Sequence, residues 1–245
     1  IGLRKYICSQ FKPNVAKALY DLFKAKNIMD FSMGWGDRLA GFFASQNTEL
    51  YVGVDPRKEN HPIYREQADY YEGQLTMFET MKKVDFYCEA AEDFYYDGYE
   101  DTFDIIFTSP PYFNVERYSH DDNQSWVRYK DIDNWNTQFL QKALDNMLPT
   151  LRSGGKLCIN ISDVYSPSAG KKAWSKICDP MNDFIQSYGG MEYKGCIGME
   201  MAKRPNSGGA GTAKDTKQYT EESLQLAKET KNKRFCEPIW IWEKK

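Results

Sequence analysis

The sequence predicts an α/β protein built on one doubly wound sheet of seven strands, mostly parallel and with an antiparallel last strand. Short apolar runs alternate with stretches of helical periodicity along most of the 245 residues. A Gly-x-Gly turn follows the first apolar run and an aspartate ends the second, which is the order used by nucleotide-binding sheets. The length suits a single domain, so we expect residues 1–245 to form one α/β unit.

Strands and helices are expected to alternate along this unit. The apolar runs expected as strands lie near residues 28–32, 50–54, 84–88, 103–107, 155–161, 192–199 and 238–242. Helices are expected at 13–24, 37–45 and 135–151, and the polar, aromatic segment 57–82 is expected to add helices over one end of the sheet. Because only a long loop joins the last two strands, they are expected to form an antiparallel pair.

The turn after the first strand contains two glycines in the stretch Met33-Gly34-Trp35-Gly36-Asp37. Glycines let the backbone approach a ligand closely, and the helix that follows presents free N–H groups at its amino end. Asp55 ends the second strand, a placement that suits the binding of ribose hydroxyls. The alternative role for Asp55, together with Pro56, is to cap the next helix.

Ser109-Pro110-Pro111-Tyr112 follows the apolar run 103–107 and is the most informative motif in the chain. The prolines end the strand because proline cannot donate to a sheet ladder. The motif then gathers a hydroxyl, carbonyls and a planar ring at the carboxyl end of a strand, where open α/β sheets bind ligands. Such a group suits a flat molecule with an amino group, since a carbonyl accepts amino protons and the ring stacks on the flat face. A Pro-Pro turn with a packed tyrosine is the simpler alternative.

Together the two motifs resemble the class I S-adenosylmethionine-dependent methyltransferases of the amino-group type, the DNA adenine-N6 and cytosine-N4 methylases. That family has a Phe-x-Gly-x-Gly cofactor loop and an Asp/Asn/Ser-Pro-Pro-Tyr/Phe catalytic loop, which correspond here to residues 31–36 and 109–112. The resemblance extends from Phe11 to the last strand. It implies a Rossmann-like methyltransferase domain, S-adenosyl-L-methionine as the cofactor and DNA as the substrate.

The same resemblance bears on the target base. A Ser-led catalytic loop is commonest among the cytosine-N4 enzymes of this family, whereas Asp-led and Asn-led loops are more typical of adenine enzymes. Many cytosine-N4 enzymes place the catalytic loop before the cofactor loop, but here the cofactor loop comes first. Cytosine N4 is therefore the first expectation, and adenine N6 stays open.

The motifs and the resemblance assign residues to three roles. The catalytic residues are Ser109, Pro110, Pro111 and Tyr112. The residues expected to bind the cofactor are Phe11, Lys12, Pro13, Asp30, Phe31, Ser32, Gly34, Gly36, Asp37, Asp55, Pro56, Ala91 and Glu92. The residues expected to contact the substrate are Arg117, Tyr118, Trp126, Lys203 and Arg204.

Simpler roles compete with several of these assignments. Lys12 suits a surface lysine as well as a partner for the cofactor carboxylate, and Glu92 suits a solvated helix start. Tyr118 and Trp126 suit base stacking, but aromatic residues make up 15% of the chain, so core packing is an equal alternative.

The expected chemistry is direct methyl transfer to an exocyclic amine, which is a poor nucleophile because its lone pair is conjugated with the ring. Hydrogen bonds from the amino protons to Ser109 and to the Pro110 carbonyl would favour a pyramidal nitrogen as the transition state forms. The base would be flipped out of the duplex or presented in a single strand. RNA or protein amide methylation, and an inactive methylase-fold subunit that only binds, remain alternatives.

The composition argues against several other classes of protein. The six cysteines form no Cys-x-x-Cys pair and there are only two histidines, so neither a metal site nor a disulfide framework is expected. There is no Pro-Cys dipeptide, the nucleophile that a resemblance to ring-carbon cytosine methylases would require. No apolar run approaches the ~20 residues of a membrane span, and the scattered cysteines suit a reducing compartment. A cytoplasmic protein of bacterial, phage or viral origin is expected.

Substrate recognition is expected from loops, because no separate recognition domain is visible. The candidate loops are 113–134, 163–180 and 203–234. The last is rich in glycine and carries eight Lys and Arg against four Asp and Glu, whereas the whole chain has a net charge of −3. We expect 203–234 to be a flap that contacts DNA phosphates, with a solvated surface loop as the alternative.

Overall fold

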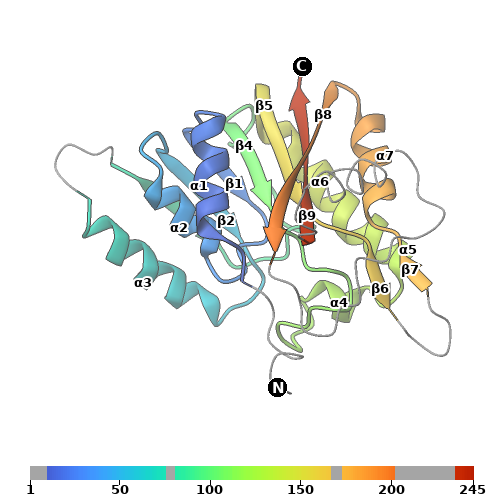
Figure 1. Cartoon of the computed structure of the whole chain (residues 1–245). Helices are drawn as coiled ribbons and strands as arrows, with labels where there is room; N and C mark the ends of the chain where they lie inside the picture. Colours follow the sequence, from blue (N-terminus) through green and yellow to red (C-terminus); the bar gives the residue numbers. More distant parts are fainter. Residues whose placement is uncertain (1–9, 76–80, 167–172, 202–234) are drawn as a thin grey trace.

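The structure is a computed structural model that describes residues 10–75, 81–166, 173–201 and 235–245. Its central feature is one sheet of seven strands in the order β3-β2-β1-β4-β5-β9-β8 (Figure 1). The strands are β1 (Asn27–Asp30), β2 (Leu50–Val54), β3 (Lys83–Tyr87), β4 (Phe103–Thr108), β5 (Leu151–Asn160), β8 (Met191–Met201) and β9 (Phe235–Lys244). The predicted α/β fold with a seven-stranded sheet is confirmed.

Five neighbouring strands of the sheet, β3, β2, β1, β4 and β5, run parallel to one another. The last strand in sequence, β9, runs in the opposite direction. β1 pairs in parallel with β2 and β4, β2 with β3, and β4 with β5. β9 runs antiparallel to both of its neighbours, β5 and β8, and lies between them. The predicted antiparallel last strand is therefore confirmed.

Helices cover both faces of the sheet, because side chains alternate across each strand. On β4, Ile105 packs in the core that contains Leu19 of α1 (Pro13–Leu22) and Phe42 of α2 (Asp37–Ala44). Ile106 packs in the opposite core, with Leu144 of α6 (Lys142–Met147) and residues of α7 (Cys178–Tyr188). α3 (Asn60–Glu72), which lies in the predicted segment 57–82, adds to the first core.

The predicted helix 135–151 begins three residues earlier, ends one residue earlier and is more irregular than expected. It consists of α5 (Ile132–Asn134), a π-helical stretch (Trp135–Gln141), α6 and a single 3₁₀ turn (Leu148–Thr150). Asp131 begins it by accepting the backbone N–H of Asn134 at 2.9 Å. Pro149 ends it, because proline disrupts the preceding helical turn, so β5 already begins at Leu151.

The segments expected as recognition loops contain short elements. Residues 113–134 include the one-turn helix α4 (Ser125–Arg128). The described part of residues 163–180 contains the antiparallel strands β6 (Val164–Ser166) and β7 (Ala173–Ser175) and the start of α7. The expected flap 203–234 lies outside the described residues. Among the described helices, none has the length and hydropathy needed to span a bilayer.

The carboxyl ends of β1, β2, β4 and β5 meet at one edge of the sheet, the lower edge in Figure 1, where α3 and α4 also lie. The described ends of β8 and β9 reach the same edge, since Met201 pairs with Phe235 there. The edge therefore gathers the residues that follow four parallel strands and the two residues from which the segment 202–234 departs.

Candidate active site

Two adjoining cavities lie at this edge, with volumes of about 570 Å³ and 470 Å³ that include space open to solvent. They share four lining residues, Ser32, Gly34, Ser109 and Tyr118. The first cavity lies over the ends of β1 and β2 and reaches Glu92, whereas the second reaches β5, β8 and β9. The sequence motifs 31–36 and 109–112 thus meet at the boundary between the two cavities.

Asp55 forms part of the wall of the first cavity. Its Oδ2 accepts the Gly34 N–H at 2.9 Å, and its Oδ1 accepts the Arg57 N–H at 2.9 Å. Burial raises the pKa of Asp55 to about 6. Each oxygen keeps a second lone pair, so the carboxylate can still accept hydrogen bonds from a diol in the cavity.

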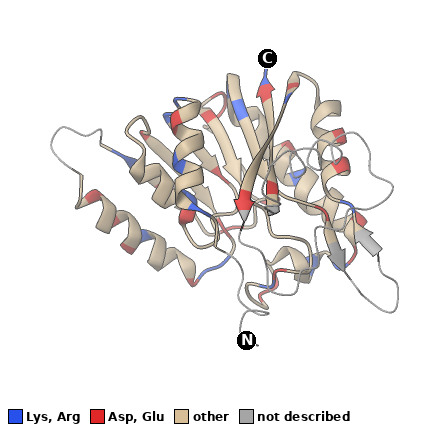
Figure 2. Ribbon diagram, in the orientation of Figure 1, with Lys and Arg blue, Asp and Glu red and all other residues tan. Residues whose placement is uncertain are grey.

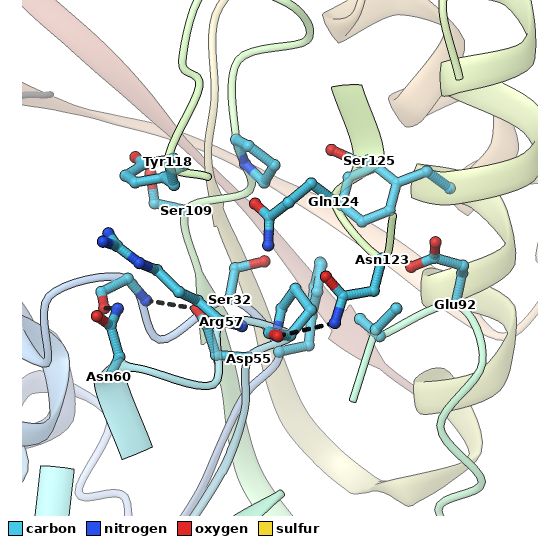
Figure 3. Close-up of a pocket in the computed structure, with 17 residues that line it drawn as sticks. Ser32, Asp55, Arg57, Asn60, Glu92, Ser109, Tyr118, Asn123, Gln124 and Ser125 are labelled. Carbon is cyan, nitrogen blue, oxygen red and sulfur yellow. Dashed lines mark hydrogen bonds between the residues drawn. The ribbon is translucent and has the colours of Figure 1, made fainter. Parts of the chain in front are cut away.

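Asn123 and Gln124 enter the same cavity from the segment after the catalytic motif, as Figure 3 shows. The Asn123 amide donates to the Pro56 carbonyl at 2.9 Å, which leaves its Oδ1 buried without a protein partner. The Gln124 Nε2 is buried without a partner as well. Such orphaned groups are costly, and these two belong to residues that line the cavity, so the lining offers one acceptor and one donor to a polar ligand.

Glu92 closes the far end of the first cavity. Its Oε1 accepts Arg128 Nη1 at 2.9 Å and the Tyr129 hydroxyl at 3.2 Å. Burial raises the pKa of Glu92 although Arg128 opposes the shift. Pro56 and Ala91, which were also predicted from the sequence, line the same cavity, as does Phe31.

The glycine loop holds its shape through left-handed backbone. Gly34 has a φ of 59° and Gly36 a φ of 81°. Gly34 lines both cavities, and its carbonyl accepts the Asn60 amide at 2.8 Å. Gly36 lines neither cavity: it precedes α2, and a Cβ on it would lie 2.2 Å from Oε1 of Gln67. Its place in the motif is explained by backbone conformation and not by ligand approach.

Asp30 also lies away from the cavities, although it was predicted to bind the cofactor. Its Oδ2 accepts Arg38 Nε at 2.8 Å and the Tyr51 hydroxyl at 2.7 Å. Asp30 and Arg38 are both buried, and neither cavity is lined by Asp30. The pair joins the end of β1 to α2 beneath the glycine loop, so Asp30 supports the loop from below.

Ser109 is held at the boundary by a chain of hydrogen bonds. Its hydroxyl donates to Oδ1 of Asn160 at 3.3 Å, and the Asn160 amide donates to the Pro238 carbonyl at 3.0 Å. Asn160 is 1% exposed and ends β5. Because the Ser109 proton is directed toward Asn160, its oxygen lone pairs remain available as acceptors in the cavities.

Tyr112 lies in the second cavity between two carboxylates. Its hydroxyl donates to Oε2 of Glu237 at 3.3 Å, and its backbone N–H donates to Oε2 of Glu116 at 3.3 Å. Burial and the two carboxylates raise the pKa of Tyr112 well above its usual value, so the ring stays a neutral phenol. Pro111 lines the first cavity, whereas Pro110 is buried and lines neither.

Of the predicted residues 11–13, one contributes to the second cavity. Phe11 lines it, and its ring lies edge-on to Phe107 at 5.4 Å and under the Arg38 guanidinium at 5.2 Å. Lys12 donates to the Glu200 carbonyl on β8, and Pro13 is the exposed first residue of α1. Asp37 also lines the second cavity, and burial raises its pKa.

The predicted substrate contacts divide into three groups. Tyr118 lines both cavities and lies edge-on to Trp35 at 6.2 Å. Arg117 and Trp126 line neither, but the Arg117 guanidinium lies 4.9 Å from the centre of the Trp126 ring. Lys203 and Arg204 lie outside the described residues.

Many lining residues are absent from the sequence-based assignments, among them Asn123, Gln124, Met199 and Glu237. Asn123 and Gln124 sit in a polar loop with no pattern of its own. Glu237 did carry a signal, because it is an acid within the apolar strand of 235–242. Within the described residues, no group of three or more His, Cys, Asp and Glu is arranged to hold a metal ion.

Comparison with known proteins agrees with this geometry. The model of a family described as DNA methylase (N6_N4_Mtase) matches residues 103–245, more than half of the chain. A comparison with curated proteins gives no match.

Solved structures with the same fold cover almost the whole chain. The MccD protein has a TM-score of 0.54 and 12% identity over 97% of this chain and 100% of its own. Residues 942–1257 of StiE O-MT have a TM-score of 0.52 and 12% identity, over 94% of this chain and 72% of theirs. TrmN from Thermus thermophilus has a TM-score of 0.50 and 12% identity, over 95% of this chain and 49% of its own. At this identity the likeness shows the fold, and the family match gives the rest: the chain belongs to the N6/N4 DNA methylase family and is a methyltransferase that uses S-adenosylmethionine.

Proposed function

We propose that this protein methylates the exocyclic amino nitrogen of a base in DNA, with cytosine N4 as the first choice and adenine N6 as the alternative. The observation that carries the proposal is the position of Ser109, which lines both cavities at the end of β4. A group on this boundary can hold an amino group taken from one cavity against a reactive group held in the other.

The residues of the first cavity fit the adenosine part of S-adenosylmethionine. Asp55 would accept the ribose hydroxyls, as its free lone pairs allow. The orphaned Asn123 Oδ1 and Gln124 Nε2 would pair with the amino group and a ring nitrogen of adenine. The methionine end would lie toward Ser32, Gly34 and the second cavity.

The cofactor supplies an electrophilic methyl group on a sulfonium, so the protein's work is to position and activate the amine. Ser109 Oγ would accept one amino proton and help to turn the nitrogen lone pair toward the methyl group. The Pro110 carbonyl, which lines neither cavity here, would accept the second proton once the base is bound. Asn160 fixes the direction of the Ser109 proton, so Ser109 meets the amine as an acceptor. Tyr112 would stack on the face of the base.

The choice of cytosine over adenine rests on the Ser-led loop. Both bases carry an amino group with two protons, so the loop chemistry alone does not separate them. Ser109 is smaller than the Asp of adenine-type loops, and the Ser-led form is the commoner one in cytosine-N4 relatives. Either base would have to leave the duplex, at a cost of a few kcal/mol.

DNA is the proposed partner, contacted by Tyr118, Trp126 and Arg117 near the cavities and by the basic segment 203–234. We also propose that residues 1–245 act as one methyltransferase domain. RNA methylation, amide methylation of a protein and an inactive binding subunit remain the competing functions. The printed sequence favours none of them over DNA.

The test is incubation of unmodified duplex DNA with the protein and S-adenosylmethionine, followed by mass spectrometry of the nucleosides. N4-methylcytosine is the expected product. Methyladenine alone would refute the cytosine choice and keep the chemistry, whereas a methyl group on a cytosine ring carbon would overturn both. Cofactor binding without methylation of any DNA would favour the competing functions.

A further inference from the structure

We propose that Glu237 is the base that takes the proton released when the substrate amino group is methylated. The inference rests on the proposed function, because it concerns the same amino group. It assigns a role to a buried carboxylate of β9 that neither the sequence motifs nor the family match singles out.

Glu237 occupies a position where the strand pattern calls for an apolar residue. Ile241, Ile239 and Glu237 lie on the same face of β9, and both isoleucines pack in the core under α1 and α2. The cross-strand partner of Glu237 is Met199, which is 3% exposed. Glu237 itself is 7% exposed. A carboxylate at the cavity end of an apolar row, in hydrogen-bond contact with Tyr112, is placed for a chemical role.

The surroundings of Glu237 place it beside the proposed base pocket. Its Oε2 accepts the hydroxyl of Tyr112, the ring proposed to stack on the base, at 3.3 Å. It lines the second cavity together with Ser109. Figure 2 shows acidic positions at the lower ends of β8 and β9, and these are the ends that reach the cavities.

Ser109 and the Pro110 carbonyl are neutral acceptors and cannot keep a proton at neutral pH. An Asp-led loop would bring a carboxylate to this point, but the Ser-led loop does not, so a carboxylate that takes the proton comes from another element. Glu116 belongs to the loop after the motif, where its Oε2 accepts both Tyr112 N–H and the Tyr118 hydroxyl. Asp37 lies at the start of α2. Glu237 is the carboxylate supplied by the sheet itself.

The step balances without a further reactant. The amino nitrogen forms a bond to the methyl carbon while the bond from that carbon to the sulfonium sulfur breaks, and the sulfur keeps the electron pair. One amino proton passes to the Glu237 carboxylate, which leaves a neutral methylated amine. Release of that proton to solvent then restores Glu237 for the next turnover.

The charge state of Glu237 depends on its neighbours in the cavity. The other titratable or charged groups that line the second cavity are Asp37, Arg38, Glu116, Tyr112 and Tyr118. Arg38 is paired with Asp30, and both tyrosine hydroxyls donate to glutamates. Among the described residues, three carboxylates (Asp37, Glu116 and Glu237) and one cation (Arg38) line this cavity, so its lining favours capture of the proton.

The test compares single-turnover methyl transfer by the full chain with saturating S-adenosylmethionine and a DNA that the wild type modifies. Glu237→Gln keeps an acceptor for Tyr112 but loses the charge. We expect its rate to fall about 100-fold or more, with unchanged cofactor affinity. The wild-type rate should fall as pH drops and Glu237 gains a proton, and this acid limb should be absent in Glu237→Gln.

Three further variants make the outcome specific. Glu243→Gln, at the other end of β9, should leave the rate and the pH profile unchanged. Tyr112→Phe should keep the acid limb, because it removes only the hydroxyl. Glu237→Asp should keep the acid limb with a lower rate, and it replaces Glu237→Gln as the decisive variant if the latter does not fold.

The proposal is overturned if Glu237→Gln retains the wild-type rate, or if its acid limb persists unshifted. A Glu237→Asp variant with no acid limb would also overturn it. A wild-type protein that binds the cofactor but methylates no DNA refutes the proposed function instead, and the inference about Glu237 falls with it. If the wild type methylates DNA and Glu237→Gln does so at the same rate, the proposal about Glu237 is overturned and the proposed function stands.

Discussion

At the residue scale, Asp55 links ligand binding to pH. Burial raises its pKa to about 6, so the carboxyl is neutral below that pH and ionised above it. An ionised carboxylate is the better acceptor for ribose hydroxyls. We therefore expect the affinity for S-adenosylmethionine to be constant above about pH 7 and to weaken by up to about tenfold per unit below pH 6, as measured by calorimetric titration.

Two variants separate Asp55 from its neighbours. Asp55→Ala should bind the cofactor weakly and without this pH dependence. Glu89→Gln, an exposed acid that lines neither cavity, should behave as the wild type. An acid-side loss of affinity that survives in Asp55→Ala would show that another group is responsible.

Tyr112 allows ring and hydroxyl to be tested separately. Tyr112→Ala removes the proposed stacking surface, worth roughly 1–3 kcal/mol per base, so turnover should fall about 10- to 100-fold or more. Tyr112→Phe keeps the ring and should lose much less. Both variants should bind S-adenosylmethionine as the wild type does. An unchanged rate for Tyr112→Ala, measured at saturating DNA, would mean that the base lies elsewhere.

At the scale of single elements, the start of α2 depends on Gly36. Gly36→Ala places a Cβ at positive φ and against the flexible end of Gln67, which must then move and give up its hydrogen bond to the Gly36 carbonyl, so unfolding free energy should fall by more than the ~1–2 kcal/mol that positive φ alone costs. Gly98→Ala is the matched control, because Gly98 has a φ of 85° with open space around it. Urea denaturation gives the unfolding free energy of both variants and of the double variant Gly36→Ala with Gln67→Ala. The difference between the single and the double variant isolates the contact with Gln67. Equal losses for Gly36→Ala and Gly98→Ala would contradict it.

The connection between β1 and α2 depends on the buried Asp30–Arg38 pair. Asp30→Ala leaves the Arg38 guanidinium buried without its partner, which should cost about 3–5 kcal/mol of unfolding free energy. Glu49→Ala breaks the exposed pair with Lys26 and should cost about 1 kcal/mol or less. Comparable denaturation midpoints for the two variants would argue against a supporting role for Asp30.

The elements were predictable where burial determines the residue pattern. Strands such as β4, buried on both faces, appear in the sequence as nearly continuous apolar runs, which Asp104 interrupts in β4. The end of the helix at Pro149 was not predictable, because helical periodicity does not mark where an α-helix changes to a 3₁₀ turn. Asp30 ends a strand as a ligand-binding acid would, but its partner Arg38 is placed by the fold. Asn123 and Gln124 reach the cavity only because a loop returns to the sheet edge.

At the scale of the whole molecule, charge is divided between a mostly acidic body and the basic segment 203–234. If this segment contacts DNA phosphates, Lys231→Ala should weaken DNA binding and reduce the slope of log affinity against log salt by about 1. The methylated base should not change, because phosphate contacts position the DNA and base contacts specify it. Lys26→Ala, at the opposite edge of the sheet, is the control, and an unaltered salt slope for Lys231→Ala would place the DNA elsewhere.

The position of β9 between β5 and β8 has a consequence for synthesis in the cell. A chain emerging from a ribosome folds from its amino end, and β1 to β5 can assemble early. The strand that fills the gap beside β5 is made only from residues 235–244, and it brings Glu237 to the second cavity. Until those residues emerge, two neighbouring strands keep unpaired edges, which are sites of aggregation. If Glu237 takes the proton as proposed, methylation needs residues 235–244 in place, and a nascent chain stalled after residue 201 should need a chaperone.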